Sequence, residues 1–100
     1  MSLRLRKRID RLNRSEAERL GAAFTALRES SDPAANYDFW AGIHHKCCPH
    51  KTALFLPWHR AFIFAFEDAL RAITGSDLTL PYWDWVATPH VPDLVTSPAF

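Results

Sequence analysis

Apolar residues recur at helical spacing in three stretches of the chain. The first stretch covers about 15–29, where one face carries Ala17, Leu20, Phe24 and Leu27. Ser15 precedes this run and Glu18 follows it by three residues, which is the pattern of a capping box. We therefore predict an amphipathic helix over 15–29 with Ser15 as its N-cap.

A second helix is predicted over about 33–45. Asp32 followed by Pro33 is typical of an N-cap with proline in the first helical turn. At 100° per residue one face of this helix carries Tyr37, Trp40, Ala41 and His44. His45 is rotated away from that face.

The third helix is predicted from Pro57 or Trp58 to about Ile73, with Gly75 at the position of a left-handed C-terminal cap. One face carries His59, Phe62, Ile63, Phe66, Leu70 and Ile73. Because this helix is apolar on most sides, we expect it to be buried and central.

Beyond Gly75 the helical pattern stops. Leu78 to Trp85 reads as an aromatic extended segment, and Pro89, Pro92 and Pro98 exclude long helices after it. The expected fold is therefore mainly α, with an irregular segment rich in proline and aromatic residues at the C-terminal end. Four Trp, seven Phe and two Tyr in 100 residues exceed what a lone small core would hide.

The net charge of +1 is unevenly spread. Residues 1–14 form a basic leader, which we interpret as a solvated arm that neutralises a more acidic domain over 15–100. No aromatic residue lies among its arginines to stack on bases, so we expect no nucleic-acid partner. No apolar run is long enough to span a membrane, and no secretory signal is visible.

The two cysteines, Cys47 and Cys48, are adjacent in the sequence. Neighbouring cysteines rarely bridge each other because the ring would be strained, so the chain has no disulfide framework. A reducing compartment, the cytoplasm by default, is the expected location.

Four of the five histidines lie within sixteen residues: His44, His45, His50 and His59. Imidazole is a common ligand for zinc, copper and iron. His44, His50 and His59 come from three separate predicted segments and could converge on one ion. A buried His59 without a partner would be costly, whereas His45 and His90 are read as ordinary polar residues.

Zinc is the rival metal on the residues alone. Cys47, Cys48 and His50, with either His44 or His45, supply nitrogen and sulfur ligands. The adjacent cysteines do not have the spacing of typical structural zinc sites. An all-imidazole site gives His59 a role and suits a redox metal.

The stretch HKTALFLPWHR over 50–60, followed by FEDAL over 66–70, closely resembles the first copper-binding signature of the tyrosinase family. LPYWDW over 80–85 is similar to the segment that follows this signature, and AGIH over 41–44 resembles the region of the first ligand. The likeness covers about 36–100.

The resemblance implies that His44, His50 and His59 are the three ligands of the first copper, with no catalytic residue beyond them. His44 is preferred to its neighbour His45, the alternative first ligand, because it shares the face of Tyr37 and Trp40. Cys48 matches the cysteine that some members join to the second histidine by a thioether. Phe55, Phe62 and Phe66 would form an apolar wall around the metal, and Glu67 would either orient a ligand or hold a buried hydrogen bond.

The family uses two coppers, and the second histidine triad has no counterpart here, because His90 alone follows His59. The resemblance implies the amino-terminal half of a four-helix-bundle dicopper domain, holding one copper of two. The missing half would come from the same polypeptide or a partner chain; otherwise the chain is a truncated, inactive relic.

The implied activity is oxidation of phenols and catechols to quinones by dioxygen, which the isolated chain is not expected to perform. Reversible oxygen binding, as in the haemocyanins, is one alternative. A non-enzymatic zinc or copper module is the other.

Overall fold

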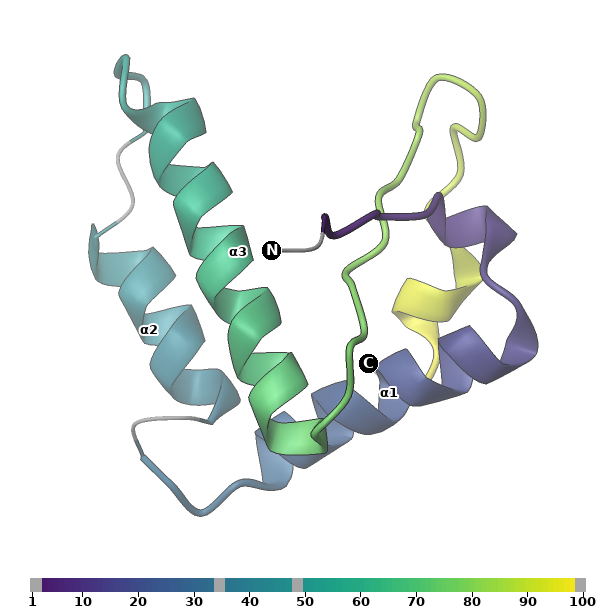
Figure 1. The fold of residues 1–100 in the computed structure, drawn as a ribbon. Helices are drawn as coiled ribbons and strands as arrows, with labels where there is room; N and C mark the ends of the chain where they lie inside the picture. The colour runs from purple at the N-terminus through teal and green to yellow at the C-terminus, as the bar shows by residue number, and fades with distance from the viewer. Residues whose placement is uncertain (1–2, 34–35, 48–49, 99–100) are drawn as a thin grey trace.

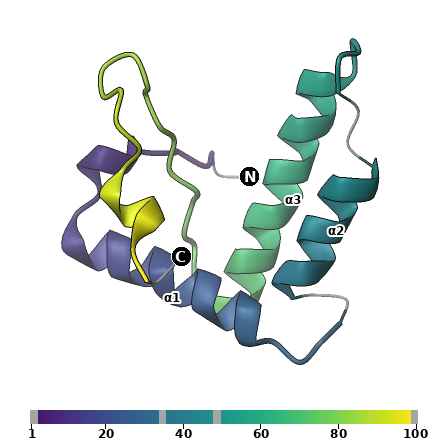
Figure 2. The ribbon, with the colours of Figure 1, turned by 180° about the vertical axis from the view of Figure 1, so that it is seen from behind.

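A computed structural model describes residues 3–33, 36–47 and 50–98. Its helices are α1 (Arg14–Glu29), α2 (Tyr37–Cys47) and α3 (Phe55–Thr74), with two short 3₁₀ helices, η1 (Ile9–Arg11) and η2 (Asp93–Thr96). Figures 1 and 2 show α2 and α3 side by side, with α1 running across their lower end. The prediction of a mainly α fold is confirmed.

The start of α1 corrects the predicted capping box. The N-cap is Asn13, whose Oδ1 accepts from the Glu16 N–H at 2.8 Å, while the Glu16 carboxylate accepts from the Asn13 N–H at 2.9 Å. The box therefore lies two residues earlier than Ser15 and Glu18. Asparagine is at least as good an N-cap as serine, and Lys7 also pairs with Glu16 at 2.9 Å, which favours the earlier start.

The start of α2 is also later than predicted. The helix begins at Tyr37, and the Asn36 side chain accepts from the Phe39 N–H at 2.9 Å. Asp32 and Pro33 lie outside the helix, which then continues to Cys47, two residues beyond the predicted end. The asparagine three residues before Phe39 supplies the same capping chemistry that was assigned to Asp32.

The third helix starts at Phe55, earlier than Pro57 or Trp58. Pro57 fits inside the first turn because the N–H groups there have no intrahelical acceptor. The predicted end is confirmed, since Gly75 adopts φ 62° and ψ 25° and its N–H donates to the Arg71 carbonyl. Without a Cβ, glycine takes this left-handed conformation without steric cost.

The core is small and lies where α1 meets the second half of α3. Its buried apolar residues are Leu20, Ala23, Leu27, Leu70 and Leu78. The prediction that α3 is a buried, central helix is wrong for this chain. Only Glu67 and Leu70 are fully buried along it, and Phe64 is 50% exposed. Part of the apolar surface of α3 is not covered by any other element among the described residues.

The basic leader is held against the body rather than extended into solvent. The backbone of Arg8 forms a parallel bridge with Tyr82, with N–H···O distances of 2.7 Å and 2.9 Å on its two sides. In Figure 1 this segment crosses the extended stretch that follows α3. Arg4 and Arg6 reach the buried carboxylate of Glu67, and Arg4 also pairs with Asp68.

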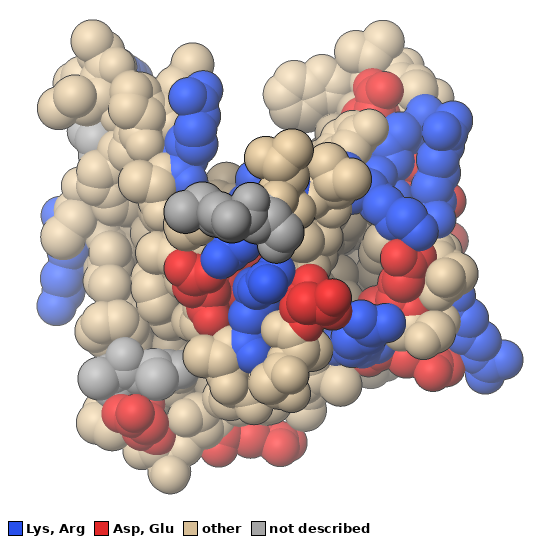
Figure 3. Space-filling view, in the orientation of Figure 1, with Lys and Arg blue, Asp and Glu red and all other residues tan. Residues whose placement is uncertain are grey.

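Charged side chains of both signs gather over this N-terminal segment in Figure 3, whereas the surface over α2 and the upper part of α3 is mostly tan with some Lys and Arg. None of the described helices combines the length and apolar character needed to cross a membrane.

Candidate metal centre

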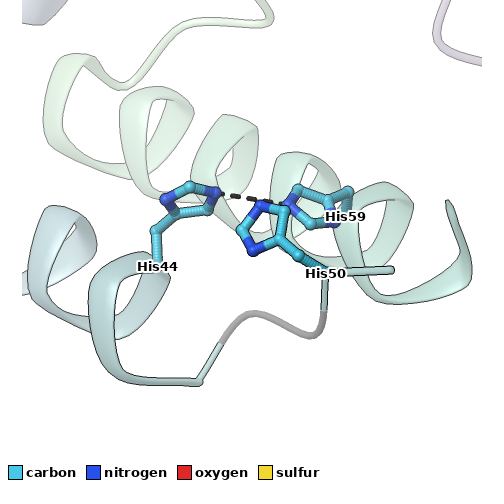
Figure 4. Close-up of side chains that lie close together, drawn as sticks. All are labelled: His44, His50 and His59. Atoms are coloured by element: carbon cyan, nitrogen blue, oxygen red, sulfur yellow. Dashed lines mark hydrogen bonds between the residues drawn. The ribbon is translucent and has the colours of Figure 1, made fainter. Parts of the chain in front are cut away.

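Three histidine rings meet between α2 and α3, at the end nearest the α2–α3 connection (Figure 4). His44 lies in the last turn of α2, His50 precedes α3, and His59 lies in the second turn of α3. One ring nitrogen from each lies within 4.8 Å of the others. The rings of His44 and His59 are half-buried, and His50 is exposed. The structure thus brings together the three histidines that the sequence singled out.

The proton on His59 is placed by the helix itself. Its Nδ1 lies 2.7 Å from the carbonyl oxygen of Phe55, one turn earlier in α3. A carbonyl oxygen only accepts, so Nδ1 carries the hydrogen and the neutral ring presents the lone pair of Nε2 to its other side. That side faces His44, since the two Nε2 atoms are 3.2 Å apart.

This separation suits a shared metal ion. Two nitrogens that each lie about 2.0 Å from one ion, at tetrahedral to trigonal angles, are roughly 3.3–3.5 Å apart. Without a metal, His44 must donate to the lone pair of His59 to satisfy the same contact. Three neutral nitrogen ligands and no carboxylate form a donor set that suits copper or zinc.

Aromatic rings surround the histidines on the protein side. Phe55 packs on His59 with ring centroids 4.3 Å apart, and Trp58 contacts His59 at 5.0 Å. Phe62 stacks on Trp58 at 5.2 Å and lies 5.7 Å from His44. These rings give the imidazoles an apolar backing that limits water on that side.

Comparison with protein families identifies relatives of this chain. Residues 31–99 match the model of the common central domain of tyrosinase.

The chain belongs to the tyrosinase family of type 3 copper proteins.

Two relatives show how far the likeness extends. Tyrosinase P of Aspergillus terreus is 44% identical over 66% of this chain, which corresponds to 18% of the relative. Hemocyanin units G and H of Sepia officinalis are 34% identical over 94% of this chain, corresponding to 19% of the relative. This tyrosinase-family chain therefore spans about a fifth of the length of these relatives.

A solved structure, that of a functional unit from octopus hemocyanin, matches the fold with a TM-score of 0.82 and 30% identity. The match covers 95% of this chain and 28% of the octopus chain. The helical arrangement around the three histidines is therefore that of a known type 3 copper domain.

Two further residues expected near the metal, Phe66 and Glu67, lie farther along α3, and Phe66 lines one cavity together with His44 and Phe62. Phe66 packs on Phe24 at 5.7 Å and on Trp40 at 5.9 Å. Glu67 is fully buried and accepts hydrogen bonds from Arg4, Arg6 and the Leu80 N–H, none of which belongs to the histidine triad. Of the two roles considered for Glu67, these contacts correspond to the buried hydrogen bond.

The ionisation of Glu67 follows from these contacts. Burial raises the pKa of its carboxyl, but the hydrogen bonds from Arg6, Leu80 and Arg4 outweigh burial and hold the pKa below its ordinary value. The group is therefore a carboxylate at neutral pH, and its charge is matched by two arginines.

The remaining candidate ligands do not join the triad. His45 and Cys47 are exposed, and the group of possible ligands found among the described residues contains neither. His90 is exposed and likewise lies outside it. Cys48 lies outside the described residues, so the thioether to His50 stays a prediction.

Two tryptophans near the centre were not predicted as site residues. Trp58 could have been found from its place directly before His59. Trp40, one turn before His44, lines a cavity of about 310 Å³ together with His44 and Phe62. The Trp40 Nε1 is buried without a hydrogen-bond partner in the described part of the chain.

Proposed function

We propose that His44, His50 and His59 bind one copper ion as the first half of a dicopper centre. With a second histidine triad from the same polypeptide or from a partner chain, the protein would oxidise phenols and catechols to quinones with dioxygen. The observation that carries this proposal is the convergence of three imidazole nitrogens within 4.8 Å from three separate segments. The family assignment supports copper as the metal.

The residues around the candidate copper site would have different roles. Copper, when bound, supplies one-electron redox chemistry and a binding position for dioxygen. His59 would bind the metal through Nε2, because its Nδ1 donates to the Phe55 carbonyl. The rings of Trp58 and Phe62 exclude water from the protein side of the site. The phenol would approach from the side that the second triad completes.

Oxygen binding without oxidation is the second candidate. It is favoured by the hemocyanin of Sepia officinalis, which aligns with 94% of this chain, and by the octopus hemocyanin fold. Both functions need the same first copper site, so the histidine geometry supports them equally. They differ in whether a phenol reaches the metals.

Copper titration of the protein tests the metal site. We expect the protein to bind one equivalent of copper per chain. His59→Ala should lose this binding, because the two remaining imidazoles bind a copper ion poorly. His45→Ala is the matched control, since this exposed neighbour lies outside the triad. Stoichiometric zinc bound through Cys47, with copper binding unaffected by His59→Ala, would contradict the proposal.

Activity measurements separate the two candidates. The chain alone is expected to oxidise dopa no faster than His59→Ala, because it supplies one triad of the two. Turnover above that control would contradict the proposal that this chain holds only half of a dicopper centre. With a second triad present, quinone formation supports oxidation, whereas reversible oxygenation without quinone supports oxygen binding.

A further inference from the structure

His50 is the triad member whose position most needs explaining. His44 and His59 are half-buried on helices, whereas His50 is exposed and precedes the first turn of α3. Its ring contacts to His44, at 5.8 Å, and to His59, at 5.2 Å, join it to two other ligands. Both of these contacts are to polar rings that are themselves candidate ligands, so an apolar ring packed on His50 would add a contact that does not depend on the metal.

The ring of Phe55 supplies such a contact. Its centroid lies 5.4 Å from that of His50, with the rings inclined by 53°, and 4.3 Å from that of His59, inclined by 35°. These separations are those of favourable aromatic pairs. Phe55 thus packs against the loop ligand and a helix ligand together.

Phe55 is itself held firmly. As the first residue of α3 it donates its backbone N–H to the Thr52 carbonyl at 3.1 Å, and Thr52 Oγ1 accepts from the Leu54 N–H at 3.2 Å. The turn that carries these bonds begins two residues after His50. The backbone of the residue that packs on His50 is therefore hydrogen-bonded within a turn that lies close to His50 in the chain.

We propose that Phe55 is a positioning residue that sets His50 and His59 at metal-binding distance before the ion arrives. This rests on the proposed copper site. The backbone carbonyl of Phe55 fixes the proton of His59, and its ring fixes the orientation of His50. A site with its ligands in place loses less freedom on binding and binds the metal more tightly.

Copper affinity of Phe55 variants, measured by competition with a chromophoric chelator, tests the proposal. Phe55→Leu is expected to weaken copper binding about 10-fold, a typical loss for a residue that supports a ligand. Phe55→Tyr keeps the ring and should restore affinity to within about 3-fold. Phe64→Leu is the matched control, because Phe64 is on the same helix, 50% exposed, and packs on Arg4 instead.

The unfolding midpoint of each variant is measured as well. Copper affinities are compared only under conditions in which every variant is fully folded, so that a loss of affinity does not reflect unfolding. Unchanged copper affinity in Phe55→Leu, or an equal loss in Phe64→Leu, would overturn the positioning role.

A second readout needs no metal. In the metal-free protein, NMR should show cross-relaxation between the Phe55 ring and both His50 and His59, with His59 protonated on Nδ1. We expect the His50 ring to become mobile in Phe55→Leu, seen as lost cross-relaxation with its neighbours, but not in Phe55→Tyr. If the wild-type protein fails to bind copper, the copper proposal falls while these contacts remain measurable. If the contacts are absent, the positioning role falls whatever the metal affinity.

Discussion

At the scale of single residues, the backbone of Lys51 is under strain beside a candidate ligand. Its φ of 60° is the left-handed region, and it directly follows His50. For a residue with a Cβ this conformation costs about 1–2 kcal/mol. Such strain persists where the surrounding structure requires a sharp turn, which here turns the chain from His50 toward the start of α3.

Replacing Lys51 tests this turn. Lys51→Gly removes the steric cost, so we expect copper affinity to be kept and stability to be equal or higher. Lys51→Val is expected to lower the free energy of unfolding by about 2 kcal/mol relative to Lys51→Gly, since a β-branched residue tolerates positive φ poorly. Both variants lose the ammonium group, so comparing them by chemical denaturation and copper titration isolates the backbone. Equal stability would show that the turn relaxes freely.

The ligand residues could be predicted because their chemistry is local. The motif around His59 indicates His50 and His59 as candidate ligands, and helical periodicity favours His44 over its neighbour His45. Phe55 was expected in the apolar wall around the metal, but its packing on both His50 and His59 and the strain at Lys51 could not be predicted, because they depend on side-chain and backbone angles that no residue pattern encodes.

At the scale of elements, all three helices were predicted but their starts were not. Two capping patterns overlap before α1, Asn13 with Glu16 and Ser15 with Glu18, and both are compatible with the apolar run. The choice between them depends on a tertiary contact, the pairing of Lys7 with Glu16. Local propensity alone leaves such boundaries open by about two to four residues.

Capping substitutions distinguish the two starts. Asn13→Ala removes the side chain that accepts from the Glu16 N–H and should lower the free energy of unfolding by about 1 kcal/mol. Ser15→Ala lies inside the helix and should change it by less than about 0.5 kcal/mol. Thermal or denaturant unfolding of the two variants measures the difference. The reverse order would restore Ser15 as the cap.

At the scale of the whole molecule, Glu67 joins three distant parts of the chain. It lies on α3, its arginine partners lie near the N-terminus, and the Leu80 N–H comes from the extended segment after α3. These partners are 61 to 63 residues away for the arginines and 13 away for Leu80. No local pattern predicts them, which is why the basic leader was interpreted as a solvated arm.

Removing this carboxylate should be costly. Glu67→Leu leaves Arg4 and Arg6 beside an apolar side chain, and we expect a loss of about 3 kcal/mol in the free energy of unfolding, as when one partner of a buried pair is removed. Glu18→Leu is the control, since Glu18 forms an exposed pair with Arg14 on the surface of α1. Urea denaturation compares them, and equal losses would contradict a central role for Glu67.

The same group predicts a dependence on pH. Its pKa is lowered on folding, so its contribution to stability is complete above the unfolded value near 4.5 and is lost as the pH falls through the lower folded value. The pKa values of Asp10 and Glu16 are also lowered, by Arg8 and by the Asn13 N–H respectively, and act in the same direction. Glu67→Gln should therefore flatten, without abolishing, the loss of stability in acid, as measured by unfolding from pH 7 to 3. An unchanged slope would assign the acid sensitivity to the other two carboxyls.

The bridge between Arg8 and Tyr82 has a consequence for synthesis on the ribosome. The segment around Arg8 leaves the exit tunnel before its partners at 79–82, which follow about 74 residues later, the separation of the hydrogen bond from Thr79 to Leu5. At 5–20 residues per second this delay lasts roughly 4–15 s. Glu67 is made 13 residues before Leu80, so we expect Arg4 and Arg6 to have access to its carboxylate roughly 1–3 s before the backbone bridge can form.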